Sequence, residues 1–501
     1  MINQEQLSFD TPEESDEPGY TEEQQAIIDS DAPRIVVKAL AGTGKTSTLV
    51  GYARAHPEKT LYIAYNKSVA VAAQRRFPPN VRAMTTHALA FPTHGKPFAH
   101  KLGTNRVGDI AEYVRLSFPQ AALVAGTLNK FMTSADEQIG KQHLPPDTNR
   151  NDMMEVSAVL SGARTMWKRM NDEKDNEVLM PHDGYLRNYI MSEPRLPYPR
   201  VMMDEAQDIN EITCRLVLQH RGPALIVGDQ NQAIYQWRGA RDALNDFPNA
   251  KVFSLTKSFR FGKGVAKVAN HVLDYLGDPL RVVGAGQYTN TRMTVDRYAP
   301  YALVARTNMT IIQGAIQTLQ HKLRSFYVGG VENIKLGLIE DGYLLFRNDR
   351  SRIKDKFIRK FTSLSALSDY ARQAKDIEMS LLCQIVLTYT HDIPMLLREI
   401  RANAVDSIQD ADRIFSTAHK AKGLEFSQVL LGDDFADLVE RGKEIPIHEQ
   451  DRQEVNLHYV AATRAIEALQ VSTQLQEFLD GREGRSLFDR VRPLLSKVMG
   501  T

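Results

Sequence analysis

Cysteine is nearly absent from this sequence: its 501 residues include only Cys214 and Cys383. Two distant cysteines cannot hold a four-cysteine iron–sulfur cluster, and structural disulfides are not expected. The 13 histidines form no zinc-spaced cluster with them. No run of 18 apolar residues occurs, and the N-terminus is polar and acidic, so we expect neither a membrane span nor a signal peptide. The composition is that of an ordinary protein with apolar cores, with 43% hydrophobic and 25% charged residues.

A strong net charge is also missing, because 62 Lys and Arg residues balance 61 Asp and Glu residues to give +1. The net charge of the whole chain therefore gives no indication of nucleic-acid binding. The distribution is uneven, since residues 1–23 hold eight acidic residues and no Lys or Arg. We predict that residues 1–18 form a disordered acidic tail and that the rest of the chain is net basic.

The most informative segment that is present is residues 39–46, ALAGTGKT, which follows the apolar run Arg34–Lys38 and precedes a helical segment, residues 47–55. Strand, glycine-rich turn and helix are the setting of a phosphate-binding loop. Backbone N–H groups and the positive helix end favour a phosphate there. Lys45 would reach the β/γ-phosphates and the Thr46 hydroxyl would hold Mg²⁺. A glycine-rich turn that binds nothing is the alternative. The loop residues predicted to bind nucleotide are Ala41, Gly42, Thr43, Gly44, Lys45, Thr46 and Ser47.

A second segment, residues 200–208 (RVMMDEAQD), is an apolar strand that ends in two acids. A carboxylate at this position can hold Mg²⁺ through water, which is the role predicted for Asp204. Glu205 would orient or deprotonate the attacking water. A strand followed by a solvated acidic turn is the alternative. Together with the loop lysine, the two acids predict hydrolysis of a nucleoside triphosphate.

A third segment, residues 225–240 (LIVGDQNQAIYQWRGA), is another apolar strand that leads into a polar loop. Gln232 is placed to sense the γ-phosphate, and Tyr235 and Trp237 offer flat faces to unpaired bases. Stacking of a base on an aromatic ring contributes roughly 1–3 kcal/mol and tolerates any base sequence. Ordinary packing of the two aromatic residues is the alternative.

These three segments resemble motifs of the UvrD/Rep-type superfamily 1 DNA helicases, and the remaining motifs of that family have matches in the expected order. The further matches are residues 20–25 (YTEEQQ), 62–67 (YIAYNK), 85–90 (TTHALA), 258–261 (SFRF), 305–308 (ARTN), 417–426 (TAHKAKGLEF) and 454–465 (EVNLHYVAATRA). The matches span nearly all of the chain. The resemblance implies that ATP and Mg²⁺ are the cofactors.

The resemblance also implies roles for single residues at the nucleotide. Gln24 would read the adenine, Phe259 would stack on the base, and Glu425 would bind the ribose. Arg260 would touch the γ-phosphate and Arg464 would be the arginine finger, so that hydrolysis depends on closure of two motor domains. The catalytic residues are thus predicted to be Lys45, Asp204, Glu205, Gln232, Arg260 and Arg464.

Contacts to single-stranded DNA are implied in the same way by the matching motifs. The predicted DNA-binding residues are Tyr65, Asn66, His87, Tyr235, Trp237, Arg306, Asn308 and His419.

Within the helicases, three segments are similar to the helicase core of the F-box DNA helicase family. These segments are residues 61–68, 180–186 and 456–464. The segment upstream of Tyr20 is too short for an F-box. A role as a ubiquitin-ligase adaptor is therefore not implied.

Strand and helix signals alternate along the chain, which predicts an α/β fold with two RecA-like parallel-sheet motor domains and two mainly helical inserted subdomains. The strands are predicted at residues 34–38, 60–64, 201–203, 225–227, 252–255, 302–305, 326–328, 413–416, 429–431 and 468–472. The predicted domains are residues 19–91 with 200–253 (first motor domain), 92–199 (helical insertion), 254–332 with 411–480 (second motor domain), 333–410 (short helical insertion) and 481–501 (C-terminal tail).

The sequence thus predicts an ATP-dependent translocase that moves on single-stranded DNA and unwinds duplexes in repair, recombination or replication, with 3′–5′ travel implied by the resemblance. One alternative is a DNA-stimulated ATPase that strips proteins such as recombinase filaments from DNA. Another is a motor subunit of a larger repair or defence complex.

The expected partners are single-stranded DNA and junctions of single- and double-stranded DNA, with the protein monomeric on DNA and away from membranes. Residues Gln6–Phe9 look somewhat like a sliding-clamp docking peptide. Such a protein would act in the nucleoid of a prokaryote, in the cytoplasm for a virus, or in a eukaryotic nucleus.

Overall fold

The computed structural model describes residues 19–235, 243–289, 291–373 and 376–482. The chain divides into two compact units. The first unit comprises Glu17–Ala39 and Gly44–Leu255, and the second comprises Leu40–Thr43 and Thr256–Thr501. The predicted acidic tail, the Gln6–Phe9 peptide, Trp237 and residues 483–501 lie outside the described residues.

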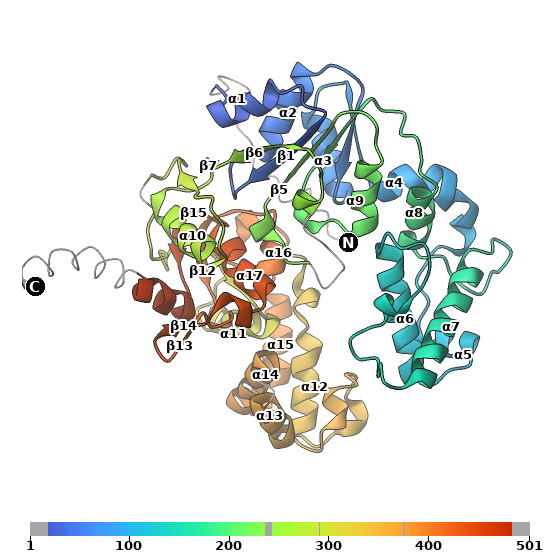
Figure 1. Ribbon diagram of the computed structural model, residues 1–501. Helices are drawn as coiled ribbons and strands as arrows, with labels where there is room; N and C mark the ends of the chain where they lie inside the picture. The colour runs from blue at the N-terminus through green and yellow to red at the C-terminus, as the bar shows by residue number, and fades with distance from the viewer. Residues whose placement is uncertain (1–18, 236–242, 290, 374–375, 483–501) are drawn as a thin grey trace, which may run out of the picture. The chain divides into compact units, whose positions relative to one another are not determined.

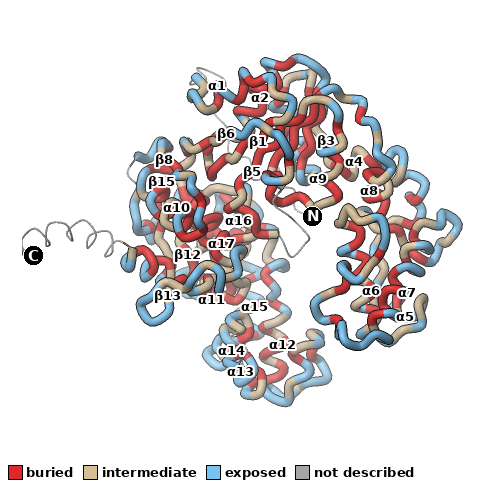
Figure 2. The backbone as a smooth tube through the Cα atoms, in the orientation of Figure 1, coloured by how far each residue is buried: buried red, intermediate tan, exposed pale blue. Residues whose placement is uncertain are grey.

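The first unit is built on a parallel sheet whose central strands are buried (Figure 2). Its strands lie in the order β3 (Val81–Thr85), β2 (Thr60–Ala64), β4 (Arg200–Met203), β5 (Ala224–Gly228), β1 (Arg34–Ala39) and β6 (Lys251–Leu255). The central strands read as continuous apolar runs, which is typical of a parallel sheet covered on both faces. In β1, Ile35 and Val37 pack with Leu49 of helix α2, whereas Val36 faces the opposite core.

Helices cover both faces of this sheet (Figure 1). The α-helices of the first unit are α1 (Glu22–Ile28), α2 (Lys45–Ala55), α3 (Lys67–Arg76), α4 (Thr86–Ala90), α5 (Val107–Val114), α6 (Phe118–Thr133), α7 (Met153–Met170), α8 (His182–Met191) and α9 (Glu211–Leu218). Its shorter helical turns are the π-helix η2 (Phe91–Gly95) and the 3₁₀ helices η3 (Lys96–Lys101), η4 (Lys141–His143), η5 (Ala206–Asp208), η6 (Gln230–Gln232) and η8 (Ala243–Asn245).

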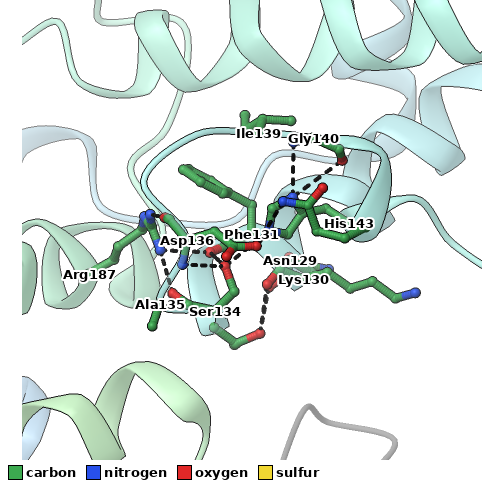
Figure 3. A network of polar contacts seen from close by, with 12 residues as sticks. Asn129, Lys130, Phe131, Ser134, Ala135, Asp136, Ile139, Gly140, His143 and Arg187 are labelled. Carbon is green, nitrogen blue, oxygen red and sulfur yellow. Dashed lines mark hydrogen bonds and ion pairs between the residues drawn. The ribbon is translucent and has the colours of Figure 1, made fainter.

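The guanidinium of Arg187 in α8 holds the end of α6 and the loop that follows it (Figure 3). It donates to the carbonyl oxygens of Phe131, Ser134 and Asp136 and lies 3.8 Å from the centre of the Phe131 ring. Burial lowers the pKa of Arg187 to about 10. One buried cation therefore satisfies several carbonyl groups that end a helix, where the backbone has no partners of its own.

Replacing Arg187 with Met should destabilise the first unit by about 2–4 kcal/mol, because buried carbonyl groups lose their donor. The control is Arg164→Met, since Arg164 also lies in this insertion but donates one bond, to Ile139, at 2.9 Å. Urea unfolding followed by circular dichroism measures both variants. Equal losses of unfolding free energy in the two variants would contradict the role of Arg187 in holding the end of α6.

The second unit contains a smaller parallel sheet in the order β10 (Ser325–Tyr327), β11 (Arg413–Thr417), β9 (Tyr301–Ala305), β12 (Phe426–Leu431) and β15 (Ala465–Gln470). Its α-helices are α10 (Lys263–Tyr275), α11 (Asn308–Gln320), α12 (Leu336–Phe346), α13 (Leu364–Gln373), α14 (Ile377–Tyr389), α15 (Ile393–Ala402), α16 (Ala418–Ala421) and α17 (Arg452–Ala462). The short elements are β7 (Lys257–Ser258), β8 (Val283–Gly284), β13 (Val439–Glu440), β14 (Lys443–Glu444), η9 (Val331–Ile334), η10 (Arg350–Arg352), η11 (Ile358–Lys360), η12 (Thr390–Asp392), η13 (Ile408–Asp410) and η14 (Ile447–Glu449).

The helical insertion of the second unit shares one core with its sheet. Ile339 of α12 and Leu382 of α14 belong to the same buried cluster as Phe415 of β11. The predicted fold class, two parallel sheets that each carry a mainly helical insertion, is confirmed. Within the described ranges, no helix has both the length and the apolar character needed to span a bilayer. Cys214 and Cys383 are buried thiols that are not joined in a disulfide.

Candidate nucleotide and nucleic-acid site

The predicted phosphate loop connects β1 to α2. Gly44 precedes α2 in a left-handed conformation with φ 76°, and Gly42 has φ 74°. Glycine adopts this conformation without the steric strain of a side chain. Gly44, the N-cap residue of α2, has no side chain with which to cap the helix, and the N–H groups and positive dipole end of a helix N-terminus suit a phosphate.

Lys45 and the two predicted acids meet in the first unit. The Lys45 Nζ lies 3.8 Å from the Glu205 Oε1, although the two residues are far apart in sequence. Asp204 is buried and accepts hydrogen bonds from the Tyr62 hydroxyl at 3.1 Å and from the Glu205 N–H at 2.8 Å. Burial, followed by the neighbouring Glu205 charge, raises the pKa of Asp204 to about 6, and Lys45 opposes this shift. A cation placed beside a buried carboxylate of this kind strongly stabilises its ionised form.

Glu205 carries backbone strain at this site, because it is a non-glycine residue with φ 53° and ψ 43°. The Gln207 amide donates to the Glu205 carboxylate at 2.5 Å, and the Gln207 Oε1 accepts the Asp229 N–H at 3.0 Å. A Cβ on Gly228 would lie 2.5 Å from that Gln207 oxygen. A side chain at position 228 would therefore displace the Gln207 amide, which links the acids after β4 to the loop after β5.

The residues present fit a magnesium–nucleotide complex. Within the first unit, Gly44 at positive φ, the N-terminus of α2 and a lysine beside two acids are features of a cradle for phosphate. Thr46, the second residue of α2, and Asp204 would hold the metal. Across the described part of the chain, no group of three or more His, Cys, Asp or Glu side chains is arranged to hold a metal ion.

Two predicted nucleotide contacts have clear local roles. Gln232 is buried and donates to the Asp229 carboxylate at 2.7 Å. Gln24 forms a capping box with Thr21 at the start of α1, in which its Oε1 accepts the Thr21 N–H at 3.0 Å. Their contacts to γ-phosphate and adenine stay predictions.

Within the second unit, Arg260 and Glu425 form an ion pair. The Arg260 Nε lies 2.7 Å from Glu425 Oε2, and its Nη1 donates to the Thr463 carbonyl at 3.1 Å. The Phe259 N–H donates to the Gly42 carbonyl at 2.8 Å, and the Phe259 side chain is exposed. The structure therefore brings together the two residues that the sequence assigned to γ-phosphate and ribose.

Arg464, the predicted arginine finger, is 2 % exposed. Its guanidinium donates to the Val460 carbonyl at 2.9 Å, the Leu424 carbonyl at 3.2 Å and the Thr463 hydroxyl at 3.2 Å. These bonds join the end of α17 to the segment before β12. Its role as a finger stays a prediction.

The predicted DNA contacts of the first unit that the structure describes lie after β2, β3 and β5. The rings of Tyr65 and Tyr235 are stacked, with centroids 6.3 Å apart and planes 15° apart. Asn66 caps α3 by accepting the Val69 N–H at 2.9 Å. The His87 ring lies 3.1 Å from the Asp183 carboxylate of α8. Tyr65 and His87 also line one pocket with Asp204.

Three predicted DNA contacts of the second unit, Arg306, Asn308 and His419, line one pocket of about 190 Å³. The Arg306 guanidinium makes two bonds of 2.7 Å to the Glu454 carboxylate, which raise the pKa of Arg306. This pairing holds the arginine between β9 and α17.

Sequence reasoning missed Tyr62, Gln207 and Glu454, each of which holds a predicted site residue. Gln207 lies inside the acidic segment and Glu454 inside the segment with Arg464, so their positions were a usable signal. Tyr62 opens the matching segment 62–67, but a tyrosine within an apolar strand resembles a core residue and so gave no sign of its bond to Asp204.

A lysine beside two acids, where parallel strands end and a helix begins, is the arrangement found in P-loop nucleotide-binding proteins. The family model described as the UvrD/REP helicase N-terminal domain matches residues 114–247, and that of the UvrD-like helicase C-terminal domain matches residues 231–476. The chain therefore belongs to the UvrD-like helicase family.

Individual proteins that are similar to this chain support the same family assignment. The chain is 31% identical over 507 residues to "F-box DNA helicase 1" of Gallus gallus, covering 92% of this chain and 49% of the relative. It is 30% identical to "F-box DNA helicase protein 1" of Schizosaccharomyces pombe, covering 90% of this chain and 57% of the relative. It is 33% identical to "DNA helicase II" of Escherichia coli over 106 residues, which are 19% of this chain and 15% of the relative. The chain spans about half the length of the F-box helicases, and the predicted resemblance to both groups is confirmed.

Proposed function

We propose that the chain is an ATP-dependent DNA helicase that moves along single-stranded DNA and separates duplexes. The observation that carries this proposal is the meeting of Lys45 with Glu205 beside the buried Asp204. A lysine that follows a glycine-rich turn, next to strand-end acids, serves phosphoryl transfer. The similarity to relatives named DNA helicases supports DNA as the polymer.

The cofactors are ATP and Mg²⁺. When bound, Mg²⁺ neutralises charge that develops on the transferred phosphoryl group. Lys45 binds the β/γ-phosphates and Thr46 and Asp204 orient the metal. Glu205, already held by Gln207, accepts the proton of the attacking water. Arg260 and Arg464 of the second unit stabilise negative charge on the γ-phosphate.

Single-stranded DNA is the track, with travel 3′–5′. Tyr65 and Tyr235 provide stacking surfaces in the first unit, and the pocket with Arg306, Asn308 and His419 provides contacts in the second. Stacking and backbone contacts tolerate any base sequence, as a motor on DNA requires. The protein acts as a monomer wherever the chromosome lies, in a nucleus or a nucleoid.

A second candidate function is the removal of proteins such as recombinase filaments from DNA. The similarity to F-box DNA helicases over about nine-tenths of the chain favours it. The same ATP site and DNA contacts serve both activities, since both need translocation.

The two functions are separated by parallel assays on the same protein. One assay follows release of a labelled strand from partial duplexes with 3′ or 5′ tails, and the other follows loss of a recombinase filament from single-stranded DNA. We expect ATP-dependent release from 3′-tailed duplexes, with none by Lys45→Ala. Filament loss with no strand release would favour the second function, and activity in neither assay would contradict both.

A further inference from the structure

The pocket that gathers Arg306, Asn308 and His419 has another wall made by the helical insertion of the second unit. Lys335 and Glu378 complete its lining. Lys335 immediately precedes α12, and Glu378 lies in the first turn of α14. The sequence assigned neither residue to nucleic acid, because both lie in an insertion outside the motor motifs.

The Lys335 ammonium is paired with Glu378 at 3.6 Å across the pocket. The lysine side chain is 55% exposed and the glutamate 30% exposed. An ion pair this open to water contributes little to stability. An incoming anion can therefore replace the carboxylate at small cost.

A second lysine lies close to this ion pair. Lys420, whose ammonium donates to the Asn333 carbonyl at 3.1 Å, has its pKa lowered by burial and by the charge of Lys335. The other carboxylates nearby are already engaged, because Glu454 binds the Arg306 guanidinium and Asp434 accepts the Thr307 N–H and hydroxyl. Lys335, which Glu378 pairs, thus also lies close enough to Lys420 for the two like charges to repel, and an anion beside the two lysines would relieve this repulsion.

We propose that Lys335 is a phosphate-binding residue for single-stranded nucleic acid and that Glu378 occupies its ammonium when nucleic acid is absent. The inference rests on the proposed function and deepens it, because it gives the helical insertion a part in gripping the strand. When nucleic acid binds, a backbone phosphate replaces the Glu378 carboxylate beside the Lys335 ammonium. Because Glu378 lies in α14, the affinity of the second unit for the strand then depends on the position of α14.

The test measures binding of fluorescein-labelled oligothymidylate to the full chain by anisotropy, without nucleotide, over a series of salt concentrations. Each phosphate contact to a single strand contributes about −0.7 to the slope of log K against log salt. Lys335→Ala should reduce the steepness by about 0.7 and weaken binding about fivefold at roughly 0.1 M salt. Glu378→Gln should tighten binding severalfold, and this gain should vanish in the double variant with Lys335→Ala.

The matched controls are Arg401→Ala and Glu332→Gln, which break another ion pair of the same region, 2.9 Å long. Both controls should leave the affinity and the salt slope unchanged. Unchanged binding in Lys335→Ala, or equal losses in Lys335→Ala and Arg401→Ala, would overturn the inference while the helicase proposal stands. Failure of the unmodified chain to bind any oligonucleotide would instead refute the proposed function.

Discussion

Replacing Lys45 with Ala is expected to reduce DNA-stimulated ATP hydrolysis by about 10²–10³-fold, since one charged donor to the transferred phosphoryl group is lost. Glu205→Gln should reduce hydrolysis by about 10²–10⁴-fold, because the amide cannot accept the proton of the attacking water. Both variants should fold normally, since the Lys45–Glu205 pair is 3.8 Å long and partly open to water. A coupled assay of ADP release measures the turnover.

The matched control is Lys38→Ala, which removes a lysine of β1 that bonds to the exposed Asn245 side chain at 3.2 Å. It should hydrolyse ATP at the rate of the unmodified chain. Retained turnover in Lys45→Ala or Glu205→Gln would remove the roles assigned to these residues.

Replacing Asp204 with Asn is expected to abolish turnover and yet stabilise the fold at neutral pH. The pKa of Asp204 is raised to about 6 in the folded chain, from a usual value of 3.8. Its proton therefore stabilises the folded state fully below about pH 4, and this stabilisation is lost as the pH rises through about 6. The shift corresponds to about 3 kcal/mol between pH 4 and pH 8, which the Asn variant should not lose.

Urea unfolding at several pH values between 4 and 8 measures this difference. The control is Asp175→Asn, because the hydrogen bond from Arg169 lowers the pKa of Asp175 to about 2. That stabilisation is lost only as the pH falls through about 2, so the effect of Asp175→Asn should be constant over the same range. A constant effect of Asp204→Asn as well would show that burial does not hold this carboxyl protonated.

The regular strands could be predicted from sequence because apolar runs in a parallel sheet are nearly continuous. The predicted run 60–64 is β2 itself, and the run 34–38 extends by one residue to Ala39. Strand β3 was missed, since its sequence VRAMT mixes polar and apolar residues at an edge of the sheet where burial is partial. The helix predicted at residues 47–55 begins two residues earlier, at Lys45, because the glycine-rich turn ends in a left-handed Gly44.

The candidate site was predicted wherever a motif keeps its residues together in sequence. The residues that bond to them come from other parts of the chain. The periodicity of apolar residues in the sequence does not indicate which distant residues will meet. Arg306 was assigned to DNA by its motif, but its bidentate bond to Glu454 depends on how β9 and α17 pack. Lys335 escaped notice for the same reason, because only the folded insertion places it beside His419.

The most direct test of the account is steady-state ATP hydrolysis by the purified chain with no nucleic acid, single-stranded DNA, duplex DNA and RNA. The account predicts a low basal rate, strong stimulation by single-stranded DNA over duplex DNA and RNA, and loss of stimulated turnover in Lys45→Ala. Hydrolysis at one rate with and without every nucleic acid, or unchanged in Lys45→Ala, would contradict a motor driven at this site.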